Sequence, residues 1–144
     1  MKIALLILLF PILCHSQGFK LKDHYPALTA IFISGAADGV RDASMFHMKG
    51  KGQFWDGSIS WENKYKDRKE GNPPAYFGST TFLVWTTDAP HLFNMISNQA
   101  MSFSVALYPQ RQRKFKHIVM DAVIYNVTRQ AGHSLMYYVI LPKR

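Results

Sequence analysis

Residues 101–108 read Met-Ser-Phe-Ser-Val-Ala-Leu-Tyr, and this stretch carries the clearest fold signal in the chain. Large apolar side chains occupy every second position and smaller ones fill the positions between, namely Met101, Phe103, Val105 and Leu107 against Ser102, Ser104 and Ala106. A β-strand sends successive side chains to opposite faces of a sheet, so this alternation is typical of a strand with one buried face. We therefore expect a β-strand over residues 101–108.

Further stretches also have the character of strands. Residues 117–127 alternate in the same way, and residues 75–87 are rich in aromatic and β-branched side chains. Residues 27–34 are short and apolar, and they are separated from the apolar stretch 42–48 by the turn signal Asp38-Gly39. The natural interpretation of that first pair is a β-hairpin.

Residues 88–98 have the character of a short helix instead. Asp88 can cap it, because a carboxylate accepts hydrogen bonds from the free backbone N–H groups of the first turn. Leu92, Phe93 and Ile96 then recur at helical spacing. Together with an apolar last segment, residues 134–141, the chain has five to seven expected strands and one or two short helices. This favours a mainly β fold, a small β-barrel with helical crossovers, over a sandwich.

The first residues resemble a secretory signal peptide over residues 1–16. Lys2 precedes an unbroken apolar run that ends in polar residues. Cleavage after Ser16 removes Cys14, the only cysteine of the chain, and leaves residues 17–144 as a single domain held by its core alone. The apolar run is too short to span a bilayer and no later run is long enough, so we expect a secreted or lysosomal protein without a transmembrane segment.

The chain is basic, with a formal net charge of +8 that falls to +7 when Lys2 leaves with the signal. A basic surface attracts anionic glycans, acidic receptors, membrane surfaces or nucleic acid, and export makes nucleic acid the weakest of these expectations. Four cations form a basic patch, Arg111, Arg113, Lys114 and Lys116. The patch is interpreted either as a solvated loop or as a site for an anionic glycan or acidic receptor. Residues 49–74, which hold four glycines and a charged cluster, are interpreted as a loop insertion.

The order and content of these segments resemble the CREG family of secreted cellular repressor glycoproteins. Four pieces carry the likeness, residues 27–43, 82–105, 117–128 and 131–135. The resemblance implies an FMN-binding split barrel of the pyridoxamine-phosphate-oxidase type, a homodimer, and a cell-surface or sorting receptor as partner. The chain departs from the family in lacking its cysteine pair. It also stops at Arg144 where family members continue, so the C-terminal strands are expected to be missing.

Flavin binding is the first chemistry that such a fold suggests. A phosphate site needs converging cations and hydroxyls, and Arg41, Lys49, Thr86 and Thr87 would supply them. Asp88, however, places a negative charge at the same junction. We therefore expect a non-enzymatic glycoprotein without a cofactor that acts through protein or glycan contacts. Two alternatives stay open, an FMN-binding oxidoreductase on the same fold and an unrelated basic secreted module that binds glycans.

Other site chemistry has little support in the sequence. The histidines are scattered without the spacing of a zinc site, and the chain has no Gly-x-Ser-x-Gly elbow for a nucleophile. We expect no catalytic residue and no metal. Asn126-Val127-Thr128 is the single N-glycosylation sequon, so Asn126 is the expected glycan acceptor in an exported chain.

Overall fold

The computed structural model describes residues 20–67, 74–109 and 114–143. Within these residues the chain is helical. It contains α2 (Leu21–Phe46), α3 (Ala89–Ala106) and α4 (Phe115–Ser134), and a π-helical turn, η4 (Leu135–Ile140), continues α4. Three short 3-10 turns lie between α2 and α3, namely η1 (Gly57–Ile59), η2 (Glu62–Lys64) and η3 (Val84–Thr86). The described residues contain a single β-bridge, Tyr65 to Ala75, and no strand.

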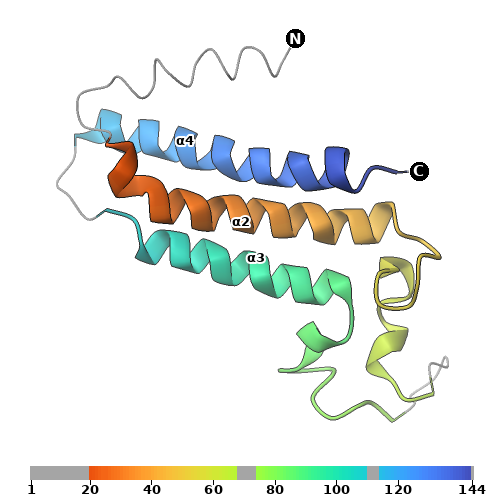
Figure 1. Ribbon diagram of the computed structural model, residues 1–144. Helices are drawn as coiled ribbons and strands as arrows, with labels where there is room; N and C mark the ends of the chain where they lie inside the picture. The colour runs from red at the N-terminus through yellow and green to blue at the C-terminus, as the bar shows by residue number, and fades with distance from the viewer. Residues whose placement is uncertain (1–19, 68–73, 110–113, 144) are drawn as a thin grey trace.

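The predicted split barrel is therefore wrong, and so is the resemblance to the CREG family that implied it. The helices lie side by side in one layer with α2 in the middle (Figure 1). α3 runs antiparallel to α2, whereas α4 runs parallel to it. α3 and α4 pack on opposite sides of α2 and make little direct contact with each other.

The alternating stretch 101–108 forms the last turns of α3 and the residues after it. Its large side chains point outward, since Met101, Phe103 and Val105 are all exposed. The buried positions belong instead to small residues three or four apart, Ser97, Ala100 and Ser104. Such spacing places them on one face of a helix. The helical period is thus carried by the small residues, while the period of two in the large residues has no structural counterpart.

The predicted hairpin around Asp38-Gly39 is likewise wrong, because residues 21–46 form one helix of 26 residues. Gly35 and Gly39 lie inside this helix at the points where α4 approaches most closely. A Cβ added at Gly39 would lie 2.5 Å from the carbonyl oxygen of His133, and one added at Gly35 would overlap the Arg129 backbone. These glycines therefore permit close approach of two helices instead of forming a turn.

Residues 117–127, predicted as a strand, form the middle of α4, where Asp121 and Ile124 are buried one turn apart. Residues 75–87, also predicted as a strand, form turns and η3. The predicted helix at residues 88–98 is present and continues to Ala106. Its N-cap is confirmed, since Asp88 Oδ1 accepts a hydrogen bond of 2.9 Å from the His91 backbone N–H.

Large apolar side chains are few inside this layer. Among the described residues nine apolar side chains are buried, and five of them are alanines. In the part of the chain that the structure describes, one cluster of larger apolar side chains joins Leu28 and Ile31 on α2 to Ile124 on α4, with Tyr125 packed against it. Twenty-four large apolar side chains of the described residues are exposed. No helix in the described part of the chain is both long enough and apolar enough to cross a lipid bilayer.

Candidate functional site, a charged cluster between the helices

The close approach of α2 and α4 brings charged side chains together across the seam. α2 contributes Asp38, Arg41 and Asp42 from two adjacent turns, and α4 contributes Arg129 and His133. Each pair that faces the other helix is spaced by four residues, so its members lie on one face. The glycines beside them remove the bulk that would otherwise hold the two backbones apart.

The ion pairs in this cluster form a continuous chain. Arg129 pairs with Asp38 Oδ2, and Arg41 Nη1 lies 3.2 Å from Asp38 Oδ1. Arg41 Nη2 is 2.9 Å from Asp42 Oδ1, and His133 Nε2 is 3.0 Å from Asp42 Oδ2. Two carboxylates thus face two guanidinium groups and one imidazole. Such pairing is needed for Asp38, whose burial would otherwise carry a large desolvation cost.

The cluster also reaches α3 and changes the acidity of Asp42. Arg41 Nη1 donates a hydrogen bond of 3.3 Å to Asn94 Oδ1 of α3. The same guanidinium group pairs with Asp38, the carboxylate that also pairs with Arg129 of α4. Burial alone would raise the pKa of the Asp42 carboxyl. Hydrogen bonds from His133 and Arg41, with their charges, outweigh burial and hold this pKa below its ordinary value.

This arrangement is suited to holding three helices together. Every acid in it is paired with a cation, and the described residues contain no group of three or more His, Cys, Asp or Glu side chains able to hold a metal ion. The seam between α2 and α3 also has a buried polar contact, because the Ser34 and Ser97 hydroxyls lie 3.1 Å apart there. We describe the charged cluster as a clamp across the layer.

A second polar group, at the start of α3, has the composition of a catalytic triad without its geometry. Ser60 Oγ donates to Asp88 Oδ2 at 2.7 Å, and His91 Nδ1 lies 2.7 Å from Asp88 Oδ1. Ser60 Oγ is also near Nδ1 of the same ring, at 3.3 Å. A base that activates serine must face it with the nitrogen that does not face the carboxylate. Here both partners meet Nδ1, so the group fastens the residues before α3 to its N-terminus.

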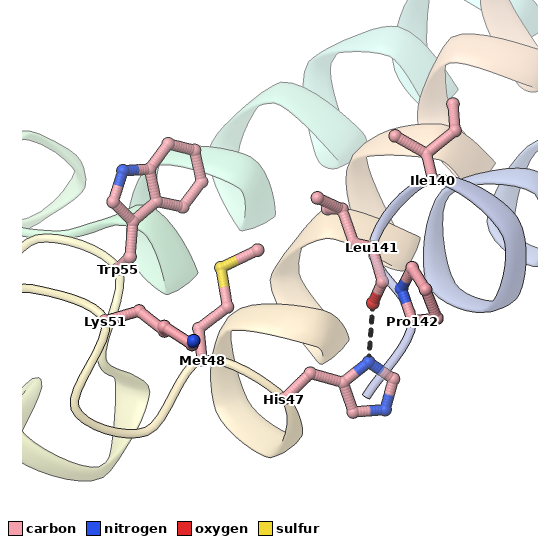
Figure 2. A pocket seen from close by; sticks show the side chains of 7 residues that line it. All are labelled: His47, Met48, Lys51, Trp55, Ile140, Leu141 and Pro142. Carbon is pink, nitrogen blue, oxygen red and sulfur yellow. Dashed lines mark hydrogen bonds between the residues drawn. The ribbon is translucent and has the colours of Figure 1, made fainter. Parts of the chain in front are cut away.

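An apolar pocket of about 440 Å³ lies at the end of the layer where α2 finishes (Figure 2). Trp55, Met48 and Lys51 line it from the segment after α2, and Ile140 and Leu141 line it from the C-terminal segment. His47 Nδ1 lies 2.7 Å from the Leu141 carbonyl oxygen. Because a carbonyl only accepts, Nδ1 carries the proton in this bond.

Stacked rings link that pocket to the charged cluster. The Tyr137 ring lies 4.2 Å from His47 and 5.5 Å from His133, measured between ring centroids. His133 in turn contacts Asp42. Tyr137 of η4 thereby joins the C-terminal end of α2 to the last turn of α4.

The four side chains named for an FMN phosphate come from two parts of the fold, Arg41 and Lys49 from α2 and the residues after it, and Thr86 and Thr87 from the end of η3. Arg41 is engaged in the cluster, while Lys49 is exposed beyond the end of α2. Thr86 donates its hydroxyl to the Leu83 carbonyl at 2.8 Å, and Thr87 bonds to Val84 and Asp88. The split barrel on which the FMN alternative was based is contradicted by the helical fold, and FMN binding by these four residues stays an untested alternative.

The remaining predicted sites fall in different places. Arg111 and Arg113 of the basic patch lie outside the described residues, as does the signal peptide at residues 1–16. Lys114 and Lys116 are exposed at the start of α4. Asn126 is exposed on α4, where its glycosylation stays a prediction.

Sequence reasoning missed the clamp. Its signal was present, because Asp38 and Asp42, like Arg129 and His133, are spaced by four residues, and Gly35 and Gly39 share that spacing. In a helix this spacing places the members of each pair on one face, one turn apart. No protein-family model matches the chain, and comparisons with curated proteins and with solved structures find no significant match.

Proposed function

We propose that this chain is a secreted, non-enzymatic binding protein that works as a homodimer through the outward apolar face of α2 and α3. The observation that carries the proposal is the distribution of apolar side chains. The helix seams hold glycine, alanine, serine, paired charges and one small apolar cluster, whereas twenty-four large apolar side chains of the described residues are exposed. Contiguous apolar surface of this kind marks an interaction site in most proteins.

The face between α2 and α3 offers the most suitable surface for a second copy. An apolar groove of about 410 Å³ runs along it, and none of its lining residues is charged. Ile33 of α2 and Phe103 of α3 line this groove, and they are 46% and 61% exposed. One such face can pair with the same face of a second copy across a two-fold axis.

The size of this face fits a modest dimer interface. α3 has 18 residues, which corresponds to about 27 Å of helix at 1.5 Å per residue. Two helices about 10 Å apart then present a face of roughly 500 Å² in projection, and side chains raise the accessible area toward the ~800 Å² per partner of a standard interface.

Sedimentation of the full chain at micromolar concentration tests the proposal. We expect a dimer for the wild type and a shift toward monomer for Ile33→Glu and Phe103→Glu, because a charge in an apolar interface is desolvated without a partner. Phe77→Glu is the matched control, since Phe77 is 84% exposed and lies outside the groove. A monomeric wild type, or an equal shift in the control, would refute the proposal.

A further inference from the structure

We infer that one end of the helix layer docks on an anionic lipid bilayer surface, a function beyond the proposed self-association. α2 and α4 begin at this end and α3 finishes there, so the start of α2 lies beside the end of α3 and the start of α4 (Figure 1). We call it the lysine end and define it as residues 20–26, 104–109 and 114–119.

Four exposed lysines occupy the lysine end, Lys20, Lys22, Lys114 and Lys116. Asp23 is the single acidic residue in the three segments, and its side chain is partly buried and engaged with a partner. The local charge is therefore positive. Clusters of this size next to apolar surface are typical of proteins that bind anionic lipid headgroups.

Large apolar side chains project between these lysines. Phe115 is 79% exposed between Lys114 and Lys116, and Val105 is 74% exposed at the end of α3. The others at this end are Leu21, Tyr25, Leu107, Ile118 and Val119, each at least 45% exposed. All seven are exposed in the part of the chain that the structure describes.

The interleaving of the two kinds of side chain selects a bilayer over other anionic partners. A sulfated glycan would engage the lysines and leave Phe115 and Val105 in water. At a bilayer surface, aromatic and aliphatic side chains enter the boundary between headgroups and acyl chains, while lysine stems extend so that their ammonium groups stay among the headgroups. Only a bilayer surface therefore accommodates both the lysines and the apolar side chains of the lysine end.

Co-sedimentation of the full chain with vesicles tests the inference. One set contains phosphatidylcholine alone and the other contains about one third phosphatidylserine. We expect binding to the second set at physiological ionic strength, weakened by added salt, and weak binding to the first. No binding to the anionic set, or equal binding to both, would overturn the inference.

Matched variants place the site. The triple variant K20Q/K22Q/K114Q should weaken binding on the order of a hundredfold, because each lysine near an anionic surface contributes roughly a factor of five. The triple K49Q/K51Q/K66Q removes the same charge from exposed lysines outside the lysine end and should change binding little. Equal losses would mean that overall charge alone is responsible and would refute the assignment.

Phe115→Ser tests the apolar half, with Phe77→Ser as control at a similarly exposed position elsewhere. We expect about a tenfold loss for the first and none for the second. Retention on heparin that is lost in K20Q/K22Q/K114Q, with no vesicle binding by the wild type, would assign this end to glycans instead. Far-UV circular dichroism confirms that each variant is folded. Dimer formation is measured without vesicles and through other residues, so either proposal can fail alone.

Discussion

Replacing Gly35 by alanine tests whether close packing of α2 and α4 holds the layer together. Helix propensity alone predicts that Gly35→Ala stabilises the protein by about 1 kcal/mol, because alanine is the better helix former. The structure predicts the opposite sign. The added Cβ would overlap the backbone carbonyl of Arg129, and backbone cannot rotate away as a side chain can. The helices would have to separate and weaken the Asp38–Arg129 pair behind the contact.

The magnitude follows from these two effects. Overpacking of a close contact costs up to about 3 kcal/mol, and the gain in helix propensity of about 1 kcal/mol offsets part of it. We expect a net loss of about 2 kcal/mol, or roughly 8 °C in the melting temperature of a chain of this size. Thermal and urea unfolding followed by far-UV circular dichroism would measure it.

Ala122→Gly is the control for the propensity effect, since Ala122 is exposed in the middle of α4. It should cost about 1 kcal/mol with no packing contribution. A Gly35→Ala protein that melts above the wild type would refute the reasoning. In that case the layer tolerates wider spacing, and the glycines are not what positions the clamp.

Three further results are expected. The pKa of Asp42 is lowered in the folded state, so its stabilising contribution is present above the ordinary aspartate pKa and is lost as the pH falls through the lowered value. Asp42→Asn should therefore remove that part of the acid dependence of the urea midpoint. Asp88→Ala should lower stability by about 1–2 kcal/mol in thermal unfolding, because it removes a buried N-cap. Ser34→Ala should cost about 1 kcal/mol, and Ser97→Ala added to it should cost little more, as a double-mutant cycle would show.

The start of α3 was predictable from sequence because its signals are local. Asp88 caps the helix with its own carboxylate, and Leu92, Phe93 and Ile96 recur at helical spacing. These features do not depend on what packs against the helix. The cap and the helix were both found.

The rest of α3 and all of α2 were mispredicted because their character depends on neighbouring helices. Ser97, Ala100 and Ser104 mark the contact face, yet small residues are weak signals when large apolar ones alternate beside them. Gly39 was interpreted as part of a turn because the sequence does not reveal that the His133 backbone faces it. The first error comes from assuming that large apolar residues mark the inside, and the second comes from interpreting Asp38-Gly39 as a turn signal.

The clamp could have been predicted only after the helices were known. Asp38 and Asp42 lie on one face of α2, and Arg129 and His133 lie on one face of α4. Once Asp38-Gly39 was interpreted as a hairpin turn and residues 117–127 as a strand, nothing placed these two charged pairs beside each other. The family resemblance reinforced the error, because a split barrel offered a place for every segment.

The central position of α2 has a consequence for how disturbances spread. Since α3 and α4 make little direct contact, a change at one outer helix reaches the other mainly through α2, beside the link from Tyr108, just after α3, to Asp121 of α4. Arg41 is the side chain best placed to transmit it, because it bonds to Asn94 of α3 and shares Asp38 and Asp42 with the cations of α4. A molecule that bends α3 outward would thus change the charge pairing around the Arg41 guanidinium group, and this change would reach the cations of α4. The layer behaves less as a single block than as two helix pairs with one member in common.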